Sequence, residues 1–472
     1  MKHILSAALL LFPFHLHGEG LPDLGDVSQT VISPQMERQI GEQSMLQIRA
    51  SEQYLNDPEI TDYLNRLGRR LVANSSESGQ PFEFFVIDDG AINAFAMPGG
   101  FIGVNTGLIL LAQSESELAS VLSHEISHVT QHHLARMVSG QKYDSLAAMA
   151  AVAVAILAAR NNPEAAQAGI IGAQGGMMQR QLDFTREHEK EADRIGLDLL
   201  QQSGFDPHAM PLFFERLQKA TKLLEGDTPS YLRTHPLTTE RVADVGNRVQ
   251  QIPFRLVADS LDFHLIRARL HAMQKPPKEA VEYFRSALGD QRFGNPLAHR
   301  YGLVLGLMRS GEETLAAQEF DTLYRKAPPN ATIETLAGRV RQIRKDPSVL
   351  EFYRTALKQY PAHRALIYDH IVLLIEKQRY SDALSRLDEQ VNLNGNDPIL
   401  YELQARAYTA LGRHQEAHHV LSYYQILHGN LRGAIEQLEL AKLAGNDYYQ
   451  LSTIETELRQ YREILEAQRK RK

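Results

Sequence analysis

The segment His124-Glu125-Ile126-Ser127-His128 determines most of what we expect of this chain. On a helix, residues four apart lie on one face about one turn apart, so His124 and His128 can reach the same metal ion. Glu125 projects beside them, where a carboxylate can act as a general base on a water molecule. This HExxH order is typical of zinc peptidases, although so short a motif needs support from the rest of the sequence.

A capping pattern marks the start of the helix that carries this motif. Ser114 and Glu117 have the spacing of a capping box, in which the serine accepts from a free backbone amide and the glutamate reaches back. The apolar residues that follow keep helical spacing, at Leu118, Val121, Leu122, Ile126 and Val129. We therefore expect the helix to pack against a core that holds its ligand side chains in place.

The region before the motif predicts two helices and a small sheet. Helical periodicity covers 34–51 and 57–74, and aromatic and β-branched residues at 82–87 favour a strand. The stretches 93–96 and 101–105 flank a Pro-Gly-Gly turn and read as a pair of strands. The strand at 93–96 is one edge at which an extended substrate could pair.

A catalytic zinc site needs a third protein ligand and one open position. Glu189 is the best candidate, because it shares a helical face with Asp193, four residues later. Glu189 would bind the metal, and Asp193 would orient the free nitrogen of a ligand imidazole and so assist catalysis. Glu191 points elsewhere on this helix, and we expect it to be solvated.

Three further histidines compete for a place at the metal. His132 would lie about 12 Å along the axis from His124, too far to share an ion on a straight helix. His133 and His188 are expected to be surface imidazoles, because a ligand must point to the inward face of its helix.

Length and composition limit the other possibilities. A chain of 472 residues is long enough for two or three domains, and a net charge of -7 with both signs mixed along the chain argues against nucleic-acid binding. Cysteine is absent, which excludes disulfides and thiolate zinc sites. A metal must therefore be bound by histidine and carboxylate side chains.

The N-terminal residues 1–20 have the pattern of a secretory signal peptide. Lys2 precedes an apolar stretch at 4–14, and Gly18 and Gly20 could flank a cleavage site. A retained membrane anchor is the alternative, and no other stretch is long and apolar enough to span a bilayer. We expect an exported protein in the periplasm.

An uncharged, alanine-rich run and a Gly/Ala/Met segment together occupy 145–178. One interpretation is a helix buried against the catalytic domain with a return loop. The other is a flap over the cleft, or a surface that makes peripheral contact with a membrane or a membrane-protein client.

Beyond residue 258 the sequence predicts a solenoid of helix pairs. The stretch 379–384 is similar to 413–418, a shift of 34 residues, which is the period of tetratricopeptide repeats. Small residues such as Ala280 recur in this setting and allow the two helices of a repeat to pack closely. We predict a mainly α protein with a signal peptide at 1–20, an α+β metallopeptidase domain with a small sheet at 21–257, and a tetratricopeptide solenoid at 258–472.

These residues resemble the gluzincin peptidases of the HtpX and Oma type. The resemblance rests on Asn93-Ala94-Phe95-Ala96-Met97-Pro98-Gly99-Gly100, on the HExxH helix, and on Glu189 with Ala192-Asp193. With the export signal and the repeats, the chain is similar to the β-barrel assembly-enhancing proteases. The resemblance implies one zinc ion per chain, degradation of stalled outer-membrane β-barrel proteins, a chaperone-like role in their assembly, and docking of the repeats on the barrel-assembly machinery.

His235 enters through this resemblance. In such proteins a histidine from a later loop can occupy the open zinc position and keep the enzyme latent, and His235 matches it. From the sequence alone, His235 is a turn residue before Pro236, because the residue before proline favours extended backbone.

Two functions remain open at this point. The first is a zinc endopeptidase in which Glu125 takes a proton from water and returns it to the leaving nitrogen. The second is a repeat-based chaperone or scaffold whose metal site is structural or plugged, since such solenoids bind peptides without catalysis. Glu125 favours the enzyme, because a purely structural zinc site has no use for a general base.

Overall fold

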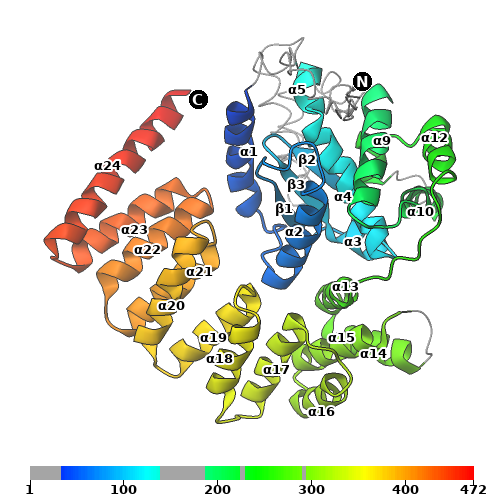
Figure 1. The fold of residues 1–472 in the computed structure, drawn as a ribbon. Helices are drawn as coiled ribbons and strands as arrows, with labels where there is room; N and C mark the ends of the chain where they lie inside the picture. Colours follow the sequence, from blue (N-terminus) through cyan, green and yellow to red (C-terminus); the bar gives the residue numbers. More distant parts are fainter. Residues whose placement is uncertain (1–32, 139–185, 224–228, 290–293, 472) are drawn as a thin grey trace, which may run out of the picture.

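The computed structural model describes residues 33–138, 186–223, 229–289 and 294–471. This part of the chain is mainly helical and contains a three-stranded sheet, which confirms the predicted fold class (Figure 1). The predicted signal peptide and the alanine-rich segment at 145–178 lie outside the described residues.

The N-terminal part contains the sheet and the helices around it. Its elements are α1 (Pro34–Arg49), α2 (Pro58–Val72), β1 (Glu83–Ile87), β2 (Ala94–Met97), β3 (Phe101–Asn105), α3 (Thr106–Leu111), α4 (Glu115–Thr130), α5 (His133–Val138), α9 (Arg186–Gln202), α10 (Ala209–Leu223), α11 (Ser230–Thr234) and α12 (Thr239–Val249). The two helices and the strands predicted upstream of the motif are all present, with ends that differ by at most two residues.

The sheet has the order β1-β3-β2. β1 pairs with β3 in parallel and β2 pairs with β3 antiparallel, so β2 is an edge strand as expected. Gly99 and Gly100 in the β2–β3 turn have φ of 77° and 83°, and a Cβ on either would lie within 2.6 Å of backbone atoms. Only glycine fits both positions, so these two residues fix the turn that leads from β2 into β3.

Helix α4 begins at the predicted cap. Ser114 Oγ accepts from the Glu117 amide at 3.1 Å, whereas the Glu117 carboxylate reaches back to the amide of Gln113, one residue before the expected position. Helix α9 packs against α4 at close range, because a Cβ on Gly196 would lie 3.1 Å from the backbone nitrogen of His124. The two helices that carry the predicted ligands are therefore held face to face.

The C-terminal part is a succession of antiparallel helices. They are α13 (Leu261–Gln274), α14 (Pro277–Gly289), α15 (Pro296–Arg309), α16 (Glu313–Tyr324), α17 (Ala331–Ile343), α18 (Val349–Gln359), α19 (Arg364–Glu376), α20 (Tyr380–Leu393), α21 (Pro398–Ala410), α22 (His414–Leu427), α23 (Leu431–Ala444) and α24 (Tyr448–Arg471). The recurring small residues Ala280, Ala383, Ala417 and Ala434 are all buried between helices. The predicted domain boundary at 257/258 falls between α12 and α13, and the assignment to the tetratricopeptide class stays a prediction.

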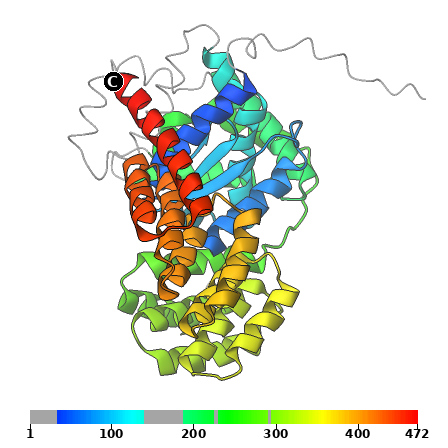
Figure 2. The same cartoon turned by 90° about the vertical axis from the view of Figure 1, so that its left-hand side faces the viewer.

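These helices curve around the N-terminal part (Figures 1 and 2). α13 packs on α2 and α3, α19 also touches α2, and Gly429 after α22 approaches Leu46 of α1. Arg269 of α13 is buried and donates to the Asp57 carboxylate at 2.7 and 2.9 Å. Arg364 of α19 pairs with Asp62 of α2 at 2.6 Å. One buried and one half-buried charge pair therefore fix the position of the solenoid on the peptidase part.

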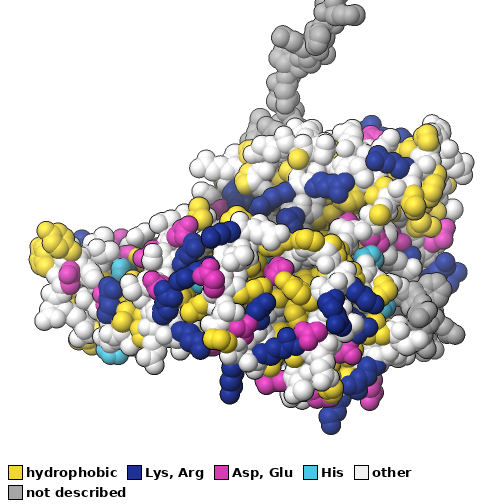
Figure 3. Space-filling model, turned by 60° about the horizontal axis from the view of Figure 1, so that its bottom comes forward, with side chains coloured by type: hydrophobic (Ala, Val, Ile, Leu, Met, Phe, Trp, Pro, Cys, Tyr) yellow, Lys and Arg dark blue, Asp and Glu magenta, His cyan; other side chains and the backbone are white. Residues whose placement is uncertain are grey.

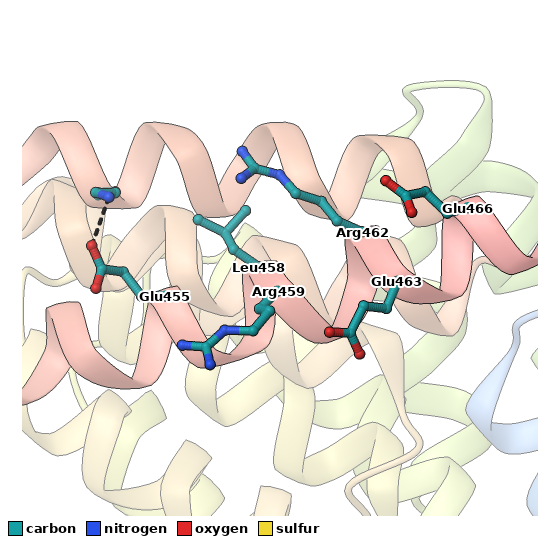
Figure 4. A pocket seen from close by; sticks show the side chains of 7 residues that line it. Glu455, Leu458, Arg459, Arg462, Glu463 and Glu466 are labelled. Carbon is teal, nitrogen blue, oxygen red and sulfur yellow. Dashed lines mark ion pairs between the residues drawn. The ribbon is translucent and has the colours of Figure 1, made fainter.

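The surface is mixed in charge. On the face seen in Figure 3, basic side chains are interspersed with acidic and apolar ones. A shallow groove between α23 and α24 is likewise lined by both signs, and there Lys442 pairs with Glu455 at 2.6 Å (Figure 4). Among the described residues, no helix is both long and apolar enough to cross a membrane.

Candidate metal centre

Four side chains from three parts of the fold converge at one buried point. His124 and His128 come from α4, Glu189 from the first turn of α9, and His235 from the residue that ends α11. One potential ligand atom from each lies within 4.8 Å of the others, and all four residues are buried. His132, His133 and His188 are not members of this cluster.

The distances among these atoms suit a metal ion with tetrahedral coordination. His124 Nε2 lies 3.0 Å from His128 Nε2, and Glu189 places its two carboxylate oxygens 3.5 Å from those two nitrogens, one on each. Zinc bonds of the usual length at tetrahedral angles separate neighbouring ligand atoms by roughly 3.3 Å. The three side chains could therefore hold zinc without rearrangement of the backbone.

Unused acceptor atoms support the same conclusion. Both carboxylate oxygens of Glu125 are buried, yet they accept no hydrogen bond from any described residue. A buried carboxylate oxygen without such a partner is costly unless a cation or water satisfies it. The donor set of imidazole and carboxylate, with no thiolate, is that of catalytic zinc sites.

Asp193 contacts the first histidine of the cluster. Its Oδ1 lies 3.0 Å from His124 Nδ1, so the other ring nitrogen of His124, Nε2, is the one available to a metal. Burial opposes the ionisation of Asp193, but hydrogen bonds from Arg241 and His124 outweigh it and hold the carboxyl pKa below its ordinary value. Asp193 is thus an anion that accepts from the His124 ring.

Arg241 is a site residue that the sequence analysis missed. From α12, its Nε and Nη2 donate to the two oxygens of Asp193 at 2.7 and 2.8 Å. Its Nη1 lies 2.7 Å from Glu189 Oε2. No motif marks this arginine, which is 48 residues from Asp193, but its position six residues after His235 is a local signal that could have been followed.

The second histidine of the cluster, His128, contacts another histidine. His133 Nδ1 lies 2.8 Å from His128 Nδ1, and His133 Nε2 lies 3.1 Å from Glu191 Oε2. If His128 Nε2 faces a metal, His128 Nδ1 carries the proton and donates to His133, which then donates from Nε2 to Glu191. The prediction that His133 lies at the surface is therefore wrong, because the turn after α4 brings His133 inward, whereas Glu191 keeps 28% of its side chain exposed and is not part of the cluster.

This arrangement predicts a zinc-binding defect in His133→Phe. The phenyl ring keeps the shape but removes the acceptor for His128 Nδ1, and loss of such an outer contact lowers metal affinity by about 10- to 100-fold. Competition with a chromophoric chelator measures the change. His132→Asn is the matched control, since His132 pairs with Glu77 at 2.8 Å and has a φ of 50° that asparagine tolerates. Equal affinity in both variants would contradict the role of His133.

The remaining histidines lie outside the cluster. His132 is turned toward Glu77, away from the ligand atoms. His188 is half-buried and stacks on His133, with ring centroids 4.5 Å apart. His188 is therefore packed on the support of His128, where it was expected to be at the surface.

His235 follows a short helix, α11, that also bonds the segment just before β2. Its Nδ1 lies 3.0 Å from Glu189 Oε1 and its Nε2 lies 3.6 Å from Glu125 Oε1. Tyr231, one turn earlier in α11, packs against the His235 ring with the centroids 4.7 Å apart and the planes tilted by 32°. The Tyr231 amide donates to the carbonyl of Ile92, just before β2, at 3.0 Å.

Comparison with known proteins agrees with this centre. The profile of Peptidase family M48 matches residues 58–249, which include all four clustered residues. The mitochondrial metalloendopeptidase OMA1 of Schizosaccharomyces pombe is 32% identical over 185 residues, covering 39% of this chain and 52% of the relative.

Two relatives match over most of the chain. A putative beta-barrel assembly-enhancing protease of Vibrio cholerae is 36% identical over 401 residues, covering 84% of this chain and 82% of the relative. The beta-barrel assembly-enhancing protease of Escherichia coli K12 is 33% identical over 410 residues, covering 86% of this chain and 76% of the relative. The match extends beyond the peptidase region into the C-terminal helices, and the chain therefore belongs to the family of β-barrel assembly-enhancing proteases, which are M48 metallopeptidases.

Proposed function

We propose that this chain is a periplasmic zinc endopeptidase that degrades stalled or unfolded outer-membrane β-barrel proteins and assists their assembly. The observation that carries the proposal is the buried set of His124, His128 and Glu189 around one point, with the Glu125 carboxylate beside it, which accepts no hydrogen bond from any described residue. A binding scaffold requires no such base. The relatives' names supply the class of substrate, and the predicted export signal supplies the compartment.

In the proposed mechanism, zinc when bound makes a water molecule acidic near neutral pH and polarises a peptide carbonyl. Glu125 takes the proton from the attacking water and delivers it to the leaving nitrogen. Asp193 and His133 fix the two imidazole rings, so that each presents Nε2 to the same point. Burial of the whole set excludes bulk water and strengthens these electrostatic interactions.

Substrate would lie along the outer edge of β2. Asn105 donates to the Asn93 carbonyl at 2.9 Å, so by antiparallel alternation Ala94 and Ala96 direct their amides and carbonyls away from β3. β2 also packs against α4, which carries Glu125. An extended peptide paired with β2 would therefore pass close to the proposed base.

The opposite edge of the sheet is closed to such pairing. The Asn65 side chain bonds both the amide and the carbonyl of Phe84 in β1, at 3.1 and 2.7 Å, and the Leu55 amide bonds the Val86 carbonyl at 3.0 Å. Covered edges do not accept another strand. The assignment of substrate to β2 follows from this asymmetry.

The solenoid provides a second binding surface for a long client. A groove of about 1450 Å³ lies between α2 and β1 on one side and α18 to α21 on the other. It contains Arg69 and Lys358 from opposite walls together with apolar residues such as Leu357 and Ile371. We propose that unfolded segments bind here while another part of the client reaches β2, and that the solenoid also contacts the assembly machinery.

A cleavage assay with a purified outer-membrane barrel protein tests this function. The substrate is offered either unfolded, by dilution from urea, or folded in detergent. We expect cleavage of the unfolded form and protection of the folded form, because only an extended chain can pair with β2. The Glu125→Gln variant should bind the unfolded form without cleaving it. Equal cleavage of both forms, or of neither, would rule out the proposal.

His235→Ala is expected to cleave casein several-fold faster than the unchanged chain. The reason is that His235 would take the fourth coordination position of the metal, which water or substrate must occupy during catalysis. Removal of its side chain opens that position. Zinc affinity should fall at the same time, since one imidazole ligand is lost. We call this blocking role of His235 the His235 latch. An unchanged cleavage rate together with unchanged zinc affinity would exclude it.

A further inference from the structure

The guanidinium of Arg241 contacts Glu189 of the cluster, Asp193 behind His124, and the loop that carries His235. Arg241 donates to both oxygens of Asp193, which holds His124, and its Nη1 lies beside Glu189 Oε2. The same Nη1 donates to the carbonyl of Pro236 at 2.9 Å. Pro236 follows His235 directly, so Arg241 joins the loop that carries His235 to the helix that carries Glu189 and Asp193.

The geometry of these contacts requires an arginine. The planar fork of the guanidinium serves Asp193 with two parallel bonds while a third nitrogen bridges Glu189 and Pro236. A lysine ammonium carries the same charge but is a point donor on a flexible stem. Arg241→Lys therefore removes the bridge while it keeps the positive charge.

The bridge also makes His235 costly to release. Arg241 is 3% exposed, so its donors have no ready access to solvent. If His235 swings away, the Pro236 carbonyl moves with it and Nη1 loses one of its two acceptors in a buried place. The position of His235 and the arrangement of Glu189 are therefore not independent.

We propose that Arg241 is a positioning residue that couples the metal-ligand set to the His235 latch. This inference rests on the proposed role of His235, and it adds the element that holds His235 in place. Disturbing Arg241 should release His235 from the metal even though the His235 side chain is intact.

Cobalt(II) added to the metal-stripped full chain tests this coupling, because its visible absorption depends on the number and type of ligands. The proteins to compare are the unchanged chain, His235→Ala, Arg241→Lys and the double variant. We expect Arg241→Lys to give the His235→Ala spectrum, and His235→Ala to cause no further change in the Arg241→Lys background. Zinc affinity of Arg241→Lys should fall about 10- to 100-fold.

A matched control separates coupling from a general loss of stability. Arg269→Lys also removes a buried arginine that donates twice to one aspartate, but it lies at the interface of α13 with α2, away from the metal. We expect Arg269→Lys to keep the spectrum of the unchanged chain. If Arg241→Lys does not fold, Thr238→Ala gives a milder test, because Thr238 Oγ caps α12 at the Arg241 amide. It should shift the spectrum partway toward that of His235→Ala.

Two results would overturn the inference. They are an unchanged cobalt spectrum in Arg241→Lys, or a His235→Ala effect of full size in the Arg241→Lys background. Failure of the proposed latch is distinguishable, because identical spectra for the unchanged chain and His235→Ala would show that His235 does not bind the metal at all.

Discussion

Glu125→Gln is expected to lower the rate of peptide hydrolysis by roughly 100- to 10,000-fold, the usual contribution of a general base. Glutamine has the same shape but cannot take a proton from water. Glu125 is fully buried and belongs to no described ion-ligand cluster, so zinc binding should be retained. Labelled casein measures the rate, and the metal content of the dialysed protein measures the zinc.

Glu187→Gln is the control for this variant. Glu187 is exposed at the start of α9 and faces no ligand atom among the described contacts. The same isosteric change there should leave the rate untouched. Loss of zinc in Glu125→Gln, or a rate equal to that of the control, would show that Glu125 has another role.

Glu189→Gln is expected to lose zinc and activity together. The amide is a poor zinc ligand, and the change also removes the carboxylate that lies 2.7 Å from Arg241 Nη1. We expect zinc affinity to fall at least about 100-fold, more than loss of an outer contact alone would cause. Chelator competition measures this, and added zinc should restore part of the casein cleavage.

Partial rescue by zinc distinguishes this variant from Glu125→Gln, in which zinc stays bound and added metal changes nothing. Asp198→Asn, another carboxylate of α9 that lies outside the cluster, is the control. Normal zinc affinity in Glu189→Gln would mean that the third ligand is a different residue.

The sequence predicted the local features of this fold well. The start of α4 follows from Ser114, and the glycine turn between β2 and β3 follows from residues that alone tolerate its backbone. His124 and His128 share a face because of helical periodicity. Each of these features depends on residues a few positions apart.

The features that the sequence did not predict depend on packing between distant segments. Arg241 joins Asp193 across 48 residues, and His133 turns inward only because the chain bends at His132, whose φ is 50°. The parallel pairing of β1 with β3 and the curvature of the solenoid around the peptidase part also required the structure. Side chains placed by such contacts leave no periodic signal in the sequence.

The central claim is that one zinc ion, held by His124, His128 and Glu189, allows Glu125 to drive peptide hydrolysis. Its most direct test is the rate of casein cleavage by the metal-stripped full chain as zinc is added back. We predict no cleavage without metal and a rate that rises until one zinc per chain is bound. Cleavage at full rate by the stripped protein would contradict the claim.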